Sequence, residues 1–315
     1  MNRTLFRRFA VLLVLALSAS LSGRAQETYL FAQRDSSSLF LDIWRPAKDA
    51  VTAVDGVSRP AILFVFGGGF IQGSRNEKFY LPWFNRLTGE GYTVISIDYR
   101  LGMKGYKVGK GLSGAFKASD RFLEAQQMGV EDVFAAVSFL DENREELEID
   151  TKNLVLSGCS AGAIISLASA YAIANGQTEG LPEGFGFKGV MSFAGAIIST
   201  SGKPVFKNAP CPILLLHGTA DQAVAYDHYG AMGRGIWGSS YLYDQLSQKG
   251  WPVSIWRFKG NTHDVAVYMD YVWPIEKDFL EKDVMQGIVR HIDATVEDPS
   301  LPVWRSVSLN DIYKP

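Results

Sequence analysis

The sequence predicts an α/β domain around a mostly parallel sheet. Short, nearly continuous apolar runs recur along the chain with helical segments between them, which is typical of parallel strands buried on both faces. These runs are residues 61–66, 93–97, 154–156, 189–193 and 213–217. An earlier pair of segments, residues 28–33 and 38–44, flanks a polar turn and predicts an antiparallel hairpin.

The remaining elements follow in chain order. Helices are expected at residues 131–143, 161–174, 241–249 and 275–292, and a further strand at 252–258. Between strand and helix, residues 101–128 are rich in Gly and Lys and are expected to form a long, lid-like insertion. Residues 230–240 are expected to be a second Gly-rich loop, and residues 293–315 an extended arm. No linker or repeat interrupts residues 26–315, which predicts a single domain.

The first 25 residues have the pattern of a signal peptide. Arg3, Arg7 and Arg8 precede an apolar run at 10–21, and a cut after Ala25 would follow small residues. The alternative is an uncleaved N-terminal anchor. No Cys directly follows the run, so a bacterial lipid anchor is not expected. We expect a periplasmic or secreted protein with no stable membrane insertion after cleavage.

Composition narrows the function classes. Hydrophobic residues make up 47 % of the chain and charged residues 20 %, which favours a folded domain over disorder. Removing the leader takes away four of 31 basic residues and leaves 27 against 33 acidic ones, a net charge of −6. A nucleic-acid partner is therefore not expected. Cys159 and Cys211 fall at opposite sheet edges, so both are expected to be free thiols.

The candidate nucleophile is Ser160, in the sequence Gly-Cys-Ser-Ala-Gly at 158–162. This motif lies between a buried strand and a helix, where a strained elbow can lift a serine hydroxyl above the sheet. Gly158 and Gly162 would let strand and helix approach closely, and the helix N-terminus would favour a developing oxyanion. The alternative is an ordinary turn that caps a helix.

A serine hydroxyl needs a base, and the chain has four histidines, all after Ser160. His263 lies in the loop after strand 252–258, at the sheet edge where Ser160 is expected, and is the predicted base. His217 is expected to be structural, His228 to share the loop of the acid, and His291 to lie inside the last helix.

The predicted acid is Asp221, in the sequence His-Gly-Thr-Ala-Asp after the strand at 213–217. Its carboxylate would hold the tautomer of His263 and stabilise the imidazolium. The alternative is a turn aspartate. Lesser candidates for the acid are Asp227, Asp264 and Asp270.

Three consecutive glycines follow the first buried strand. Their bare amides suit an oxyanion hole, which is predicted to use the N–H groups of Gly68, Gly69 and Ala161. A nucleotide loop is the alternative, but the glycines lack the required spacing and a Walker lysine. Phe70, Tyr99 and Trp237 are predicted to shape the substrate pocket, with ordinary packing as the alternative for each.

Together these segments resemble the α/β-hydrolase superfamily. More narrowly they resemble secreted bacterial esterases related to acetylxylan and feruloyl esterases and to hormone-sensitive-lipase-like carboxylesterases. The resemblance rests on LFVFGGGF at 63–70, SIDYRLG at 96–102, LSGCSAGA at 156–163, HGTAD at 217–221 and His263. The chain departs from the family at Phe66, where members have a His before the glycines.

The resemblance implies an α/β-hydrolase fold and hydrolysis of carboxylic esters through an acyl-enzyme, without a metal or organic cofactor. The expected substrate is a small-molecule or oligosaccharide ester, including acyl groups on carbohydrates. A serine peptidase or acyl transferase with the same triad is one alternative. A non-catalytic binding protein on a hydrolase scaffold is the other.

Overall fold

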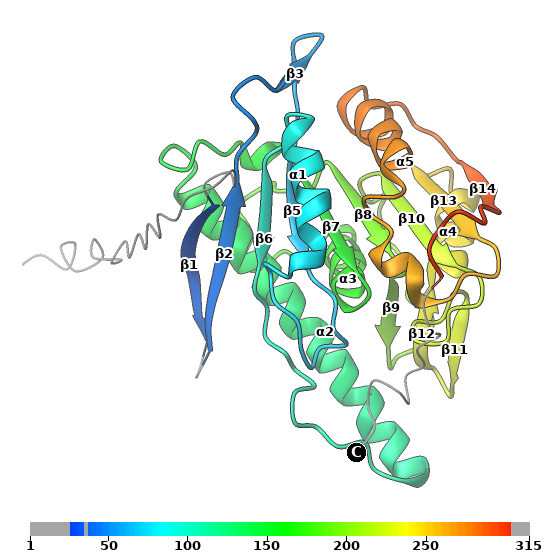
Figure 1. Cartoon of the computed structure of the whole chain (residues 1–315). Helices are drawn as coiled ribbons and strands as arrows, with labels where there is room; N and C mark the ends of the chain where they lie inside the picture. The colour runs from blue at the N-terminus through cyan, green and yellow to red at the C-terminus, as the bar shows by residue number, and fades with distance from the viewer. Residues whose placement is uncertain (1–25, 35–36, 304–315) are drawn as a thin grey trace, which may run out of the picture.

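The central feature of the computed structural model, which describes residues 26–34 and 37–303, is a nine-stranded sheet (Figure 1). Its strand order is β1-β2-β6-β5-β7-β8-β10-β13-β14. From β6 to β14 every neighbouring pair is parallel, whereas β1, β2 and β6 pair antiparallel. The predicted α/β-hydrolase architecture, with its N-terminal hairpin, is therefore confirmed. The predicted signal peptide, residues 1–25, lies outside the described residues.

Apart from β14, the strands of this sheet agree with the predicted strands to within a few residues. They are β1 (Gln26–Arg34), β2 (Ser37–Trp44), β5 (Ala61–Val65), β6 (Val94–Ile97), β7 (Leu154–Cys159), β8 (Gly189–Phe193), β10 (Ile213–Gly218), β13 (Val253–Phe258) and β14 (Asp293–Val296). All residues of β5, β6, β7, β8 and β10 are buried, as expected for strands covered on both faces.

Helices cover both faces of the sheet. In Figure 1, α1 (Leu81–Gly89) and α5 (Trp273–Asp278) lie over one face, and α2 (Gly111–Glu142) and α3 (Ala161–Ala174) over the other. The small side chains of α3 allow it to pack deep in the molecule, and almost all of its residues are buried. A side chain at Gly129 of α2 would lie 2.4 Å from the Cδ1 atom of Ile165, so α2 and α3 pack closely there.

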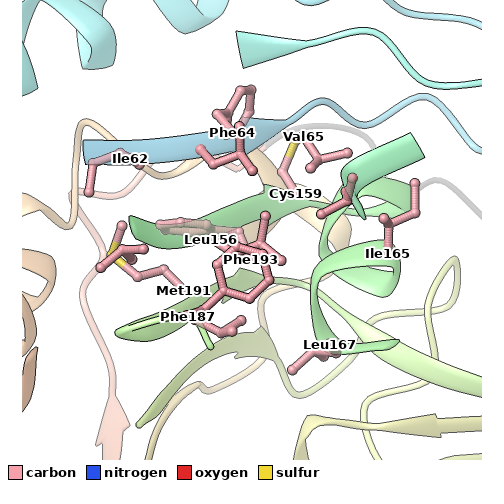
Figure 2. Packing of buried hydrophobic residues seen from close by; sticks show 14 of the residues in the cluster. Ile62, Phe64, Val65, Leu156, Cys159, Ile165, Leu167, Phe187, Met191 and Phe193 are labelled. Carbon is pink, nitrogen blue, oxygen red and sulfur yellow. The ribbon is translucent and has the colours of Figure 1, made fainter. Parts of the chain in front are cut away.

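The core lies between these layers and directly beneath the nucleophile. Figure 2 shows buried side chains of β5, β7 and β8, including Phe64, Leu156 and Phe193, together with Ile165 and Leu167 of α3. Each of these five side chains is fully buried. Phe64 and Phe193 contact Trp83 of α1, on the face of the sheet opposite α3. The strand ends that carry the candidate site therefore rest on a densely packed support.

Three expectations about secondary structure are wrong. Residues 111–128, expected to belong to a loop, are the first half of α2, so only 101–110 are irregular; a role of this region as a lid stays a prediction. The helix was missed because its buried positions there are small, including Gly114, Ala118 and Ala125, and give a weak hydrophobic period.

The Gly-rich segment 230–240 is also more regular than expected. It contributes to a hairpin of β11 (His228–Ala231) and β12 (Arg234–Gly238), and β12 pairs with β9 (Ala196–Ser199). Met232 and Gly233 in the turn both have positive φ, 53° and 74°, as tight hairpin turns require. The glycines therefore allow the tight turn and the close approach of the two strands, and they do not form an irregular loop.

The predicted last helix, 275–292, is shorter than expected. α5 continues into a π-helical segment, η4 (Phe279–Met285), and the chain then leaves the helix around Gly287, whose φ is 68°. His291 lies outside any helix, and the start of the predicted arm forms β14, which pairs with β13. The smaller elements are β3 (Ala53–Val54), β4 (Val57–Ser58), η1 (Lys78–Tyr80), η2 (Thr151–Asn153), α4 (Ser239–Gln248) and η3 (His263–Val267).

Candidate active site

Four loops meet at the carboxyl edge of the parallel strands. They follow β5, β7, β10 and β13, and they carry the glycine run, Ser160, Asp221 and His263 respectively. Because β5, β7, β8, β10 and β13 are consecutive neighbours in the sheet, residues far apart in sequence come together. Ligand sites of open α/β sheets form at this edge.

Ser160 occupies a strained position between β7 and α3. Its φ is 52°, a conformation that non-glycine residues rarely adopt. The turn is held by a hydrogen bond from the Ser160 amide to the Phe193 carbonyl, at 2.9 Å. The flanking glycines are required sterically, because a Cβ on Gly162 would lie 2.0 Å from the Val65 oxygen and one on Gly158 2.4 Å from Gly162.

The structure brings the three predicted side chains into one hydrogen-bonded chain. Ser160 Oγ lies 2.8 Å from His263 Nε2, and His263 Nδ1 lies 2.7 Å from Asp221 Oδ2. The His263 side chain is 14 % exposed and that of Asp221 is fully buried, so Ser160 and His263 line the cavity while Asp221 lies behind them. This geometry supports proton transfer from the hydroxyl to an imidazole that a carboxylate orients.

Several hydrogen bonds hold the carboxylate of Asp221 in place. Its Oδ1 accepts hydrogen bonds from the amides of Ala223 and Val224, at 2.8 and 3.0 Å. Burial by itself would raise the pKa of Asp221, but hydrogen bonds from His217 and His263 outweigh it and hold the pKa well below its usual range. Asp221 is therefore ionised at neutral pH and can stabilise an imidazolium at His263.

His217 was expected to be only structural, but it contacts the candidate acid directly. Its Nε2 lies 3.2 Å from Asp221 Oδ2, and its Nδ1 lies 2.8 Å from Ser239 Oγ. The imidazole is fully buried. It therefore helps to hold the carboxylate toward His263. The four-residue spacing between His217 and Asp221 was the signal in the sequence that could have suggested this contact.

Backbone amides line the cavity beside Ser160. Gly67, Gly68 and Gly69 form part of its wall, and the φ angles of Gly68 and Gly69 are 120° and 63°. Ala161 is the first residue of α3, so its amide has no carbonyl partner within the helix. The three predicted oxyanion residues are thus in two segments that flank the nucleophile.

The cavity itself has a volume of about 550 Å³. Its other lining residues come mainly from the segment after the glycine run and from η3. They include Gln72, Glu77, Phe79, Tyr80, Ala266 and Val267. The Phe79 side chain is 54 % exposed, which is unusual for a large aromatic ring. Sequence reasoning missed this segment because it lacks a motif.

The three residues predicted to shape the substrate pocket lie outside the lining of this cavity. Phe70 and Tyr99 are 2 % and 3 % exposed and pack edge to face beneath the glycine loop, with ring centroids 6.4 Å apart. Trp237 is buried in the β11–β12 hairpin against the ring of His228. None of these three lines the cavity, so the prediction that they shape the pocket is wrong: all three are core or hairpin packing residues.

Two of the three lesser candidates for the acid have other side-chain partners. Asp270 pairs with Arg86, and Asp264 accepts a hydrogen bond from Thr262.

Cys159 and Cys211 are both free, as predicted. Within residues 26–34 and 37–303, no cluster of three or more His, Cys, Asp or Glu side chains could hold a metal ion. No helix in that part of the chain has the length and apolar character needed to cross a bilayer.

Comparison with known proteins relates the chain to esterases. The profile described as "Carboxylesterase family" matches residues 24–181. Fumonisin B1 esterase of Sphingopyxis macrogoltabida is 29 % identical over 140 residues, which cover 44 % of this chain and 24 % of that protein. Chlorogenic acid esterase of Aspergillus niger is 26 % identical over 179 residues, 56 % of this chain and 29 % of that protein. The chain thus spans less than a third of the length of either relative.

A solved structure matches over a larger share of the chain. The propionate-bound esterase Est2 of Thermogutta terrifontis superposes with a TM-score of 0.57 at 20 % identity, covering 82 % of this chain and 95 % of that one. At this identity the likeness concerns the fold.

Proposed function

The chain belongs to the carboxylesterase family, and from this we propose that it cleaves carboxylic esters through an acyl-enzyme formed on Ser160. One observation carries the proposal, the continuous chain from Ser160 Oγ through His263 to Asp221, with hydrogen bonds of 2.8 and 2.7 Å. The Ser160 end of this hydrogen-bonded chain opens into a cavity bordered by the glycine run. These are the parts that acyl transfer to a serine requires.

In the first half-reaction, Ser160 Oγ attacks the ester carbonyl while His263 Nε2 takes the hydroxyl proton. The carbonyl oxygen becomes an oxyanion, which the amides of Gly68, Gly69 and Ala161 would stabilise. His263 then gives its proton to the leaving alcohol, and the acyl group stays on Ser160. Asp221 keeps Nδ1 protonated throughout and stabilises the imidazolium.

In the second half-reaction, water replaces the alcohol. His263 takes a proton from the water, which attacks the acyl carbon, and the proton then returns to Ser160 Oγ as the acid is released. The same oxyanion site serves both steps, so no further group is required.

For the substrate, we propose an acyl group on a carbohydrate, as in the acetylxylan and feruloyl esterase branch. The half-exposed ring of Phe79 lies at the cavity with Gln72 and Glu77 beside it. A sugar ring has apolar faces and a polar rim, so an aromatic ring flanked by hydrogen-bonding groups suits it. The carboxylate of Glu77 would disfavour anionic acyl groups.

A panel of esters tests both the proposed reaction, ester hydrolysis, and the proposed substrate, an acylated carbohydrate. Short p-nitrophenyl esters, acetylated sugars and feruloylated sugars are compared with aminoacyl-nitroanilides, which a peptidase would prefer. Ser160→Ala and His263→Ala are expected to lower kcat by at least about 10³-fold while both variants remain folded. Fluorophosphonate should label the wild type and not Ser160→Ala. Turnover retained in Ser160→Ala would refute the mechanism, and preference for nitroanilides would refute the ester class.

We also propose that the enzyme acts in the periplasm or outside the cell. The support is the basic and apolar pattern of residues 1–25 with small residues at Gly23 and Ala25. N-terminal sequencing of the protein from fractionated cells tests this. A mature chain that begins at Gln26 in the exported fraction is expected, and an intact Met1 in the cytosol would refute it.

A further inference from the structure

A buried tyrosine hydroxyl connects the glycine loop to the strand that carries the nucleophile. Tyr80, on η1, accepts a hydrogen bond from the Gly67 amide at 3.0 Å. The same oxygen lies 3.2 Å from Cys159 Sγ, and Cys159 immediately precedes Ser160. Tyr80 and Cys159 are each 2 % exposed, so water does not compete for these contacts.

The chemistry of the two groups allows both contacts at once. Burial raises the pKa of the Tyr80 phenol and raises that of the Cys159 thiol to about 11, so both are neutral near pH 7. A neutral phenol oxygen can accept from Gly67 N–H and donate its own proton to the sulfur. The hydroxyl therefore provides a buried acceptor for the Gly67 N–H.

This contact matters because Phe66 occupies the position of the family's loop histidine. The Phe66 ring is 2 % exposed and packs on the Tyr99 ring, with centroids 4.5 Å apart. It has no polar atom and so cannot hold the loop by a side-chain hydrogen bond. The loop must then be held from elsewhere, and the contact to Tyr80 is a side-chain hydrogen bond on its first glycine.

The loop is also in direct contact with the nucleophile. A Cβ on Gly67 would lie 3.1 Å from the Cys159 oxygen and 3.3 Å from Ser160 Cβ. In Figure 2 the Cys159 side chain points toward β5, the strand from which the glycine loop continues. A shift of Gly67 would therefore move the amides of Gly68 and Gly69 relative to the Ser160 hydroxyl.

From this arrangement we propose that Tyr80 is a positioning residue that sets the distance between the oxyanion amides and Ser160. It does so through Gly67 on one side and Cys159 on the other. The inference rests on the proposed esterase function for its kinetic consequences, and on the structure alone for the anchoring of Gly67.

The kinetic test is Tyr80→Phe, which removes only the hydroxyl. An oxyanion held less accurately should lower kcat by about 10-fold or more and leave KM within about 2-fold. Inhibition by a trifluoromethyl ketone, whose adduct with Ser160 carries an oxyanion, should weaken by a similar factor.

The matched control is Tyr92→Phe. Tyr92 is also fully buried, and its hydroxyl accepts a hydrogen bond from Arg59 Nη1 at 2.6 Å. This variant loses a buried hydroxyl in a part of the molecule outside the candidate site, so its thermal unfolding midpoint should fall while kcat stays at the wild-type value. A kcat loss of equal size in both variants would mean that Tyr80 acts only through stability, and would overturn the proposal.

A second measurement does not need turnover. Hydrogen exchange of the Gly67 amide, followed by NMR, should be slow in the wild type and at least about 10-fold faster in Tyr80→Phe. Unchanged exchange, or an effect confined to KM, would overturn the proposal. A wild type that hydrolyses no ester would instead refute the proposed function, and the exchange data would still decide the role of Tyr80.

Discussion

Three glycines that differ in the space around them predict a graded series of alanine variants. None of Gly162, Gly67 and Gly186 has a positive φ, so alanine at each adds steric bulk without backbone strain of the left-handed kind. The new Cβ would lie 2.0 Å from Val65 O at Gly162 and 3.1 Å from Cys159 O at Gly67. At Gly186 it would meet nothing within 4 Å.

These distances set the expected magnitudes. At Gly162 the contact is about 1.4 Å shorter than an ordinary separation of 3.4 Å, and its partner is backbone that cannot rotate away. Either α3 or the end of β5 must shift by about that amount, which separates Ser160 from the glycine loop. A misplacement of about 1 Å can cost about 100-fold in rate, so kcat/KM should fall by at least that factor. The overpacking should also lower the free energy of unfolding by about 1–3 kcal/mol.

At Gly67 a shift of a few tenths of an ångström suffices, so we expect about a 10-fold loss of kcat/KM with a smaller loss of stability. Gly186→Ala is the control and should match the wild type. The assays are turnover of p-nitrophenyl acetate and thermal unfolding followed by circular dichroism. The reasoning would be refuted if Gly162→Ala kept kcat/KM within 2-fold of wild type, or if Gly67→Ala were the more damaging change.

Three other predictions concern charge and substrate contact. Asp221→Asn should lower kcat by about 10⁴-fold, because the amide no longer selects the His263 tautomer. The lowered pKa of Asp221 stabilises the fold above its unfolded pKa of about 3.9, and this contribution is lost as pH falls toward the native pKa. The wild-type unfolding midpoint should therefore drop more steeply below pH 5 than that of Asp221→Asn. Glu276 is fully buried beside Trp83 Nε1, at 2.7 Å, and burial raises its pKa well above the usual value. Above about pH 4.3 this carboxyl group ionises in the unfolded chain but stays protonated in the folded one, which opposes folding by about 1.4 kcal/mol for each pH unit by which the native pKa is raised. Glu276→Gln should therefore unfold at a higher temperature than wild type at pH 8, and this difference should close at pH 4. Phe79→Ala should raise KM for an acetylated sugar more than for p-nitrophenyl acetate, and equal effects in a kinetic comparison would contradict the sugar contact.

Local sequence patterns were sufficient to predict most strands of the main sheet. The strands β5, β7, β8 and β10 are continuous apolar runs because they are covered on both faces, and helix α3 starts at the residue after Ser160, as expected from the elbow motif. The same patterns failed for α2, whose buried face is made of small residues, and for β11 and β12, whose glycines resemble a loop. In both cases tertiary contacts stabilise the element more than its own hydrophobic period does.

Sequence patterns were enough to predict the fold class and the three polar residues at the edge of the sheet. Chain order, together with the rule that parallel strands end at one edge, leaves few other candidates for Ser160, Asp221 and His263. The surroundings of these residues became visible only in the folded molecule. His217 on the carboxylate, Tyr80 on the glycine loop and Phe79 at the cavity are contacts across the fold, and Phe70, Tyr99 and Trp237 are buried without lining the cavity. Side-chain direction depends on how the packed layers meet, which no short segment of sequence encodes.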